Sequence, residues 1–199
     1  MTDKTFIALD LEMNAKDREA HSAKIIQVGV AIGSYRNYLN QDYIEKSWFV
    51  DPDEDIEPVI TELTGITNSD VKFNSSSYKQ IHDDINKLIS DNFCCVNPVV
   101  WGGGDLPLLT KEIKQDLGYC NVFGFREIDV KTIHTFYLIS KNKNTKSSLQ
   151  SAITQNKLKF KGTPHRAVDD ARNTLNLFFH LLEKQSKIQD LLNQASNLV

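Results

Sequence analysis

The stretch FIALDLEMN, residues 6–14, decides the fold of this 199-residue chain. Aromatic, β-branched and aliphatic side chains alternate in its first half, which predicts a buried strand over residues 5–10. Successive side chains of a strand point to opposite faces, so Asp10 and Glu12 share one face and Leu11 points the other way, into the core. Two acids on one face of an apolar strand are costly to bury unless a cation relieves them. The alternative is an ordinary strand end with solvated acids.

Four more strands are predicted further along the chain from runs of β-branched, aliphatic and aromatic residues. Gly33 and Asn37 are turn signals between the second and third strands, which favours an antiparallel meander for the first three. The fourth and fifth strands are short and are separated by helical sequence. The predicted strands span residues 5–10, 24–32, 45–50, 98–101 and 127–130.

Helices are predicted where apolar residues recur at helical spacing. Ile81, Ile85 and Leu88 recur in this way after a run of serines that provides N-caps. A strand meander followed by alternating helices and strands predicts an α/β fold, a five-stranded mixed sheet of three antiparallel and two parallel strands with flanking helices. The predicted helices span residues 56–63, 77–90, 105–117, 131–140, 147–156, 166–184 and 188–198.

The length suits one domain over residues 1–199, with a core at about 5–182 and a helical tail at 186–199. The tail sequence KIQDLLNQASNLV fits either a homodimer contact or a simple capping helix. No apolar run approaches the roughly 20 residues that span a bilayer. The N-terminus lacks the features of a signal peptide, so we expect a cytoplasmic protein.

Net charge is −3, which by itself does not indicate nucleic-acid binding. The charge is uneven, however, because residues 51–62 carry six acids and no base, whereas residues 141–172 carry eight bases. A basic surface beside an acidic site suits a phosphate chain, and the alternative is a solvated lysine-rich loop. The three cysteines have no CxxC spacing, so we expect neither a disulfide framework nor a zinc site.

Asp105 stands after three glycines between a predicted strand and a predicted helix. Glycines allow the unusual backbone angles and close approach that such a turn needs. Asp105 would therefore lie at the helix N-terminus. An N-cap is a common role for aspartate at that position and is the alternative to a metal ligand.

His165 and Asp170 form a third group in the segment PHRAVDDARN. His165 would lie on the loop before a helix, and Asp170 more than one turn inside it. Asp169 and Asp170 point about 100° apart on a helix, so only one of them can join a common site. Carboxylates that converge without a basic partner repel each other and commonly hold divalent cations, and a histidine beside them is a candidate general base. This combination suggests two-metal phosphodiester cleavage.

Taken together, these segments resemble the DEDDh-type DnaQ-like 3′-5′ exonucleases, whose three motifs are similar to DLE, the Asp after the glycine turn, and HRAVDDAR. The similarity extends over residues 5–182 and includes LTGIT (63–67) and FREIDVKTI (125–133). Within the family the chain looks most like the ERI-like exoribonucleases, ribonuclease T and oligoribonuclease. Gln27 stands where many relatives have an acid.

The resemblance implies a ribonuclease H-like fold and two divalent cations, Mg²⁺ or Mn²⁺. Matched by motif, Asp10 would bridge both cations, and Glu12 and Asp170 would complete the tighter site. Asp105 would act mostly through water. His165 would be the base that removes a proton from the attacking water, with release of a nucleoside 5′-monophosphate.

A single-stranded 3′ end is the substrate that the resemblance implies. Met13 and Asn14, with the turn at Gly65 and Ile66, match family positions near the terminal nucleotides. Arg166 would neutralise a phosphate beside the site. The alternatives are that Met13 and Ile66 simply fill space or core, and that Arg166 pairs with Asp169 at the surface.

We therefore predict a metal-dependent 3′-5′ exonuclease that acts on single-stranded nucleic acid, with RNA slightly favoured. The nearest alternative is the same chemistry on DNA, in proofreading or repair. An inactive module that binds nucleic acid or serves as a scaffold is less favoured, because the four acids and the histidine are all present.

Overall fold

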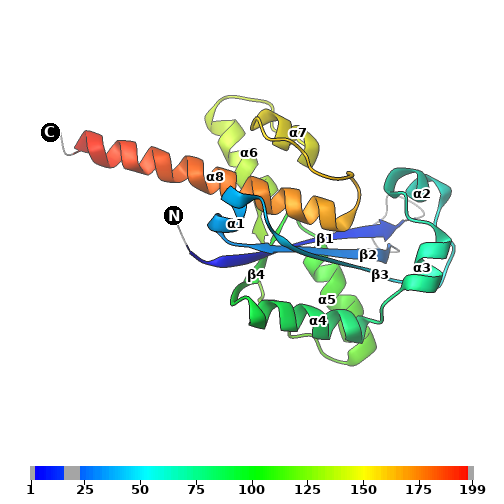
Figure 1. The fold of residues 1–199 in the computed structure, drawn as a ribbon. Coiled ribbons are helices and arrows are strands. Elements are labelled where there is room, and N and C mark those ends of the chain that lie inside the picture. The colour runs from blue at the N-terminus through cyan, green and yellow to red at the C-terminus, as the bar shows by residue number, and fades with distance from the viewer. Residues whose placement is uncertain (1–2, 16–22, 197–199) are drawn as a thin grey trace.

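The computed structural model describes residues 3–15 and 23–196. Its strands are β1 (Thr5–Asn14), β2 (Lys24–Gly33), β3 (Ile44–Phe49), β4 (Cys94–Val100) and β5 (Ile128–Asp129). They form one sheet in the order β3-β2-β1-β4-β5 (Figure 1). The first three strands pair antiparallel, whereas β4 pairs parallel with β1 and with β5. The predicted mixed sheet is confirmed.

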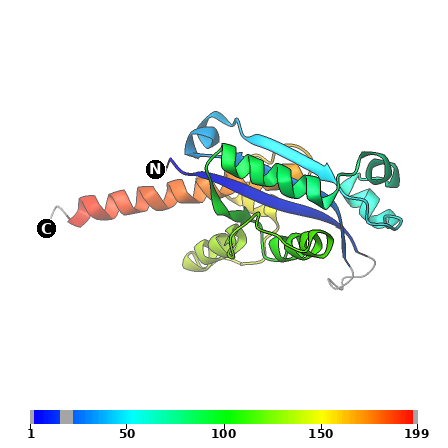
Figure 2. The same cartoon turned by 90° about the horizontal axis from the view of Figure 1, so that it is seen from below.

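Helices cover both faces of the sheet (Figures 1 and 2). The helices are α1 (Tyr35–Asn40), α2 (Pro58–Thr64), α3 (Asn68–Asn74), α4 (Tyr78–Asp91), α5 (Asp105–Leu117), α6 (Val130–Ser140), α7 (Leu149–Gln155) and α8 (Ala167–Ser196). Helix α8 crosses β1 and β2 on one face and contacts α1, α6 and α7, whereas α4 and α5 pair on the other face. Helices α2 and α3 contact β1 and β3 at the end of the sheet where the predicted site lies.

The alternation of side chains in β1 separates two hydrophobic cores. Ile7, Leu9 and Leu11 are buried against α4 and α5. Phe6 and Ala8 face α8, where the Phe6 ring lies 4.9 Å from that of Phe178. Asp10 and Glu12 continue the series of Phe6 and Ala8, so the sheet presents both acids to the first turns of α8.

Strand β1 extends four residues beyond the predicted end at residue 10, because β2 pairs with it as far as the contact between Asn14 and Lys24. Helix α8 is continuous where two helices were predicted. The segment that links them contains neither glycine nor proline, so nothing in it interrupts the helix.

Two short helices were not predicted. Helix α1 occupies the expected turn, and it begins at a capping box in which Ser34 and Asn37 bond reciprocally. Helix α3 begins at a second capping box, formed by Thr67 and Asp70. Both helices are too short to show an apolar period, which is why spacing alone did not predict them.

Strand β4 begins at Cys94 rather than at the predicted residue 98. Proline lacks the backbone N–H that a strand ladder uses, which made Pro98 look like a first strand residue. The structure tolerates it because the register between β1 and β4 shifts from Phe6–Cys95 to Ala8–Val99, and Pro98 lies in that irregularity. No helix within residues 3–15 and 23–196 has the length and apolarity needed to cross a membrane.

Candidate active site

The end of β1 supplies two of the predicted site residues. Asp10 is paired with Gly29 of β2, and Glu12 is paired with Gln27. Glu12 is only 8% exposed, and Asp10 is half-buried. Neither carboxylate forms an ion pair within the described chain. The prediction that both acids lie on one face is consistent with this register, because directly paired residues of antiparallel strands project to the same face.

The start of α8 lies directly on this part of the sheet. A Cβ atom on Gly29 would lie 2.2 Å from the carbonyl carbon of Ala167 and 2.2 Å from the nitrogen of Val168. Only glycine permits this approach of a helix backbone to a strand. The buried Gln27 side chain holds the same turn, because its Oε1 accepts a hydrogen bond from the Ala167 N–H at 3.1 Å.

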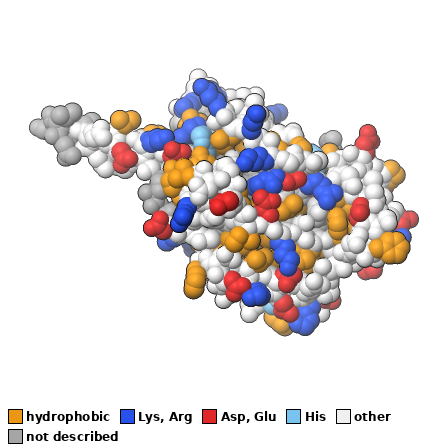
Figure 3. Space-filling view, in the orientation of Figure 1, with side chains coloured by type: hydrophobic (Ala, Val, Ile, Leu, Met, Phe, Trp, Pro, Cys, Tyr) orange, Lys and Arg blue, Asp and Glu red, His pale blue; other side chains and the backbone are white. Residues whose placement is uncertain are grey.

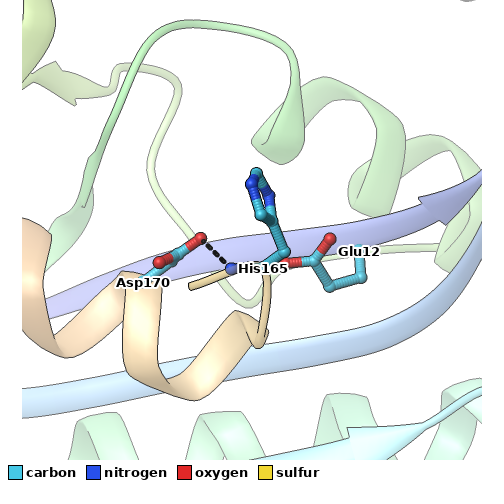
Figure 4. A group of neighbouring side chains, drawn as sticks. All are labelled: Glu12, His165 and Asp170. Atoms are coloured by element: carbon cyan, nitrogen blue, oxygen red, sulfur yellow. Dashed lines mark hydrogen bonds between the residues drawn. The ribbon is translucent and has the colours of Figure 1, made fainter. Parts of the chain in front are cut away.

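His165 and Asp170 meet Glu12 at this junction. Ligand atoms of these three side chains all lie within 4.8 Å of one another. The backbone N–H of His165 donates to Oδ2 of Asp170 at 3.2 Å. His165 has φ of 62°, a left-handed conformation that is uncommon outside glycine. Figure 4 shows His165 between the side chains of Glu12 and Asp170, with a dashed line from its backbone nitrogen to Asp170.

The loop that carries His165 is held from α8. Oδ2 of Asp169 accepts from the Thr163 N–H at 2.9 Å, and Asn173 accepts from the Lys161 N–H at 3.0 Å. Asp169 also forms an ion pair with Arg172, which in turn contacts Glu45 of β3 at 2.8 Å. Asp169 therefore holds the loop in place, whereas Asp170 lies with Glu12 and His165.

Asp105 is brought to the site by the glycine turn. Gly102 and Gly104 have φ of 85° and 127°, a region that favours glycine. Gly104 is the N-cap of α5 and no side chain caps this helix, so Asp105 is not the N-cap that the alternative proposed. The turn is fixed by Asp129, whose Oδ1 accepts from the Gly102 N–H at 2.9 Å.

The pKa values of all four acids are raised above their usual range. Burial, followed by the charges of Asp105, Asp170 and Glu12, raises the pKa of Asp10 well above its usual range. Burial and the neighbouring acids raise the pKa of Glu12 to about 8. Burial also raises the pKa of Asp105 to about 7 and that of Asp170 to about 6. Such a cluster is unfavourable as free anions and favourable around positive charge.

The donor set fits divalent cations of the magnesium type. It consists of carboxylate oxygens from separate elements, with one imidazole beside them, and hard cations prefer such oxygen ligands. The Arg166 guanidinium lowers the pKa of Glu12, whereas burial and the charges of Asp170 and Asp105 raise it. The site is thus short of positive charge.

Arg166 does not pair with Asp169, so that alternative from the sequence is wrong. Its guanidinium carbon lies 5.6 Å from the ring centroid of Phe49. Asp169 is already occupied by Arg172. Arg166 thereby remains on the same side as Glu12 and near α3, where it also lowers the pKa of Asp70.

The other predicted substrate contacts differ in their surroundings. Asn14 is fully buried, and its side chain bonds to Glu54 and to the backbone of Asp55 and Glu57. Ile66 is fully buried in a small core cluster, which agrees with the alternative that this residue simply fills the core. Met13 is half-buried, whereas Gly65 is exposed and ends α2 with φ of 69°. Side-chain contact with a ligand is therefore open to Met13 but not to Asn14.

Glu127 was not predicted as a site residue. Its charge raises the pKa of Asp105, and its Oε2 is buried without a hydrogen-bond partner in the described chain. The signal lay in the topology, because β4 and β5 pair in parallel with Val100 opposite Asp129. Glu127 immediately precedes β5, and β5 lies beside the strand that leads into the glycine turn of Asp105.

Basic side chains gather over α7 and the start of α8 in the view of Figure 3. Lys157, Lys159 and Lys161 are exposed, and none forms an ion pair within residues 3–15 and 23–196. Leu158 and Phe160 between them pack against the core beside α8. These three lysines of the predicted basic stretch, unlike Arg172, are thus exposed cations without an ion pair in the described chain, and they lead along the chain to His165.

Comparison with known proteins identifies related sequences and folds. A family model described as RNase_T, exonuclease, matches residues 7–178. No curated protein matches the chain by sequence. The nuclease domain of 3′hExo, a DEDDh family member bound to rAMP, has a TM-score of 0.74 at 16% identity, over 91% of this chain and 92% of that one.

Two further solved structures share the fold. Cell-death related nuclease 4 (CRN-4) gives a TM-score of 0.75 at 15% identity, over 91% of this chain and 64% of that one. A 3′-exonuclease that recognises the 3′ end of a histone mRNA stem-loop gives 0.75 at 15% identity, over 92% and 84% of the two chains. These likenesses confirm the ribonuclease H-like fold.

Proposed function

The chain belongs to the RNase_T exonuclease family, as a DEDDh-type 3′-5′ exonuclease, and from this premise we propose that it removes nucleoside 5′-monophosphates from single-stranded 3′ ends by two-metal-ion hydrolysis. The observation that carries the proposal is the convergence of Glu12, His165 and Asp170, whose ligand atoms lie within 4.8 Å of one another. Two segments far apart in sequence, the end of β1 and the start of α8, meet there, and the charges of Asp10 and Asp105 act on the same group of acids.

Two Mg²⁺ or Mn²⁺ ions, when bound, supply an activated water and neutralise charge on the attacking and leaving oxygens. Asp10, Glu12 and Asp170 would hold them, and Asp105 would contribute mostly through water. The assignment of Asp10 as a metal ligand rests on its match to the first family motif, and the charges of the other three acids raise its pKa. The raised pKa values of the cluster support this role, since cations would replace the protons that the buried acids otherwise retain.

His165 is the proposed general base. Its imidazole is exposed on a loop held from α8, within 4.8 Å of the carboxylates of Glu12 and Asp170. That position lets it take a proton from the attacking water and pass it to solvent. Its φ of 62° is an unfavourable backbone conformation for a residue other than glycine, and such conformations cluster at functional sites.

The substrate is proposed to be a single strand, with RNA slightly favoured. Arg166, next to Glu12, would neutralise a phosphate. Backbone at Met13, Asn14 and Gly65 and the core position of Ile66 would shape the terminal-nucleotide site. One structural relative is bound to rAMP and another recognises a histone mRNA stem-loop, and that favours RNA over DNA here.

We assign this activity to a single domain over residues 1–199 with its core at 5–182. The last turns of α8 expose Ile188, Leu191 and Leu192, and this apolar stripe supports a homodimer contact of the tail. Light scattering coupled to gel filtration tests this: a dimer is expected for the wild type and a monomer for Leu191→Glu.

A digestion time course tests the function. Single-stranded RNA and matching DNA, each labelled at the 5′ end, are incubated with Mg²⁺, Mn²⁺ or EDTA. A metal-dependent ladder that shortens from the 3′ end is expected, faster on RNA. Intact substrate in every metal, from protein with a cooperative melting transition, would contradict the proposal.

A further inference from the structure

Gln27 is buried at the junction between the sheet and α8. It is 0% exposed, although glutamine is mostly an exposed residue in proteins. A buried amide of this kind is costly unless its polar atoms are used. The position of Gln27 in β2, opposite Glu12 in β1, places this amide beside a residue of the proposed metal site.

One atom of the amide fastens the helix. The first backbone N–H groups of a helix have no partner inside the helix. Oε1 of Gln27 accepts the hydrogen bond of one of them, from Ala167 at 3.1 Å, across 140 residues of sequence. Gly29, two residues further along the strand, gives the same turn the space to approach.

The other atom of the amide is unused. Nε2 of Gln27 is buried and has no hydrogen-bond partner in the described chain. Side chains that are directly opposite in an antiparallel pair have Cβ atoms about 4.5–5.5 Å apart. Glu12 is the residue directly opposite Gln27 in this pair, so its carboxylate is the acid that we assign to this donor.

We propose that Gln27 is a positioning residue, which ties Glu12 on the sheet to Asp170 in α8 and to His165 in the loop before it. Its Oε1 fixes the first turn of α8, and its Nε2 donates a hydrogen bond to the Glu12 carboxylate when cations occupy the site. The two halves of the metal site come from β1 and from the start of α8. The Gln27 side chain bonds to the start of α8, and Gln27 is paired with Glu12 of β1. This inference rests on the proposed metal-dependent function.

Two substitutions separate the roles of the two atoms. Gln27→Met keeps the length of the side chain and removes both the acceptor and the donor. Gln27→Glu keeps an acceptor for the Ala167 N–H and replaces the donor with an anion. Ile85→Val, in α4 on the opposite face of the sheet, is the control for a general loss of packing, because Ile85 is buried away from the site.

Amide hydrogen exchange, Mn²⁺ titration calorimetry and steady-state kinetics are measured on each full-length variant. For Gln27→Met, exchange at Ala167 accelerates, and Mn²⁺ affinity and kcat each fall about tenfold with little change in KM. Gln27→Glu retains slow exchange at Ala167 but has a lower Tm without metal, since its added charge faces Glu12. Ile85→Val changes Tm and leaves Mn²⁺ affinity unaltered.

Mn²⁺ binding by Gln27→Met that equals the wild type would overturn the positioning role, as would exchange at Ala167 that is equally fast in Gln27→Glu and Gln27→Met. Either result leaves the exonuclease proposal intact. A wild-type protein that neither binds Mn²⁺ nor cleaves would instead contradict the proposed function itself, and the positioning role with it.

Discussion

Asp10 lies directly across the β1–β2 pair from Gly29, and the backbone of Ala167 rests on that glycine. A Cβ at position 29 would come within 2.2 Å of the carbonyl carbon of Ala167. The fold therefore brings the helix that carries Asp170 to the strand that carries Asp10 at a place where no side chain intervenes.

Gly29→Ala is expected to displace the start of α8. Inserting atoms into a packed site typically costs about 1–3 kcal/mol, and a clash with backbone belongs at the upper end. Thermal unfolding and Mn²⁺ titration should show both a lower Tm and weaker metal binding. Gly103→Ala is the matched control, because a Cβ there would meet nothing within 4 Å. Equal Tm values for the two variants would contradict the close contact.

Stability without metal should fall as pH rises. The folded-state pKa values of Glu12 and Asp105 are about 8 and about 7, above the unfolded values of about 4.3 and 3.9. The folded state then binds more protons than the unfolded state, so the stabilisation present below about pH 4 is lost as pH approaches about 8. Melting curves in EDTA across this range should show a falling Tm.

Magnesium should reverse that trend. Cations bind the deprotonated cluster of the folded state only, so the rise in Tm on adding Mg²⁺ should grow with pH. The same curves recorded with Asp10→Asn, which removes one charge of the cluster, should show a smaller fall in EDTA and a smaller rise with Mg²⁺. A pH-independent effect of Mg²⁺ would argue against binding at these acids.

His165→Ala should lower kcat by roughly 10²-fold or more, since general bases contribute at that level. Metal binding should change little, because the carboxylates remain in place. Single-turnover cleavage together with Mn²⁺ calorimetry checks both statements. Cleavage within a few-fold of the wild type would remove His165 from the role of base.

Asp169 and Asp170 should differ when substituted. Asp170→Ala removes a metal ligand, and we expect loss of Mn²⁺ binding and of cleavage. Asp169→Ala breaks the ion pair with Arg172 and the bond to the Thr163 N–H, so its main effect should be on Tm. Equal loss of Mn²⁺ affinity in both variants would show that the assignment between the two aspartates is mistaken.

The periodicity of β1 was the part of the site most readable from sequence. Alternation fixes which residues share a face, so the pairing of Asp10 with Glu12 follows from strand geometry alone. The motif spacing placed His165 ahead of a helix and Asp170 inside it, where the structure has them. Both features depend only on the conformation of a short segment, and the sequence of that segment determines its conformation.

Contacts between distant elements were harder to predict. The roles of Gln27 and Glu127 could not be predicted from their own segments, because these roles depend on which strand lies beside which. The short helices α1 and α3 depend on caps rather than on apolar spacing. Strand β4 starts before Pro98 only because a shift of register accommodates the proline.

The most direct measurement identifies the first product released from an unlabelled single-stranded RNA. Mass spectrometry of early time points with Mg²⁺ should show the nucleoside 5′-monophosphate of the 3′-terminal residue, and none in EDTA or with Asp10→Asn. Release from the 5′ end, internal fragments as first products, or undiminished cleavage by Asp10→Asn would contradict a metal-dependent 3′-5′ exonuclease built on these four acids.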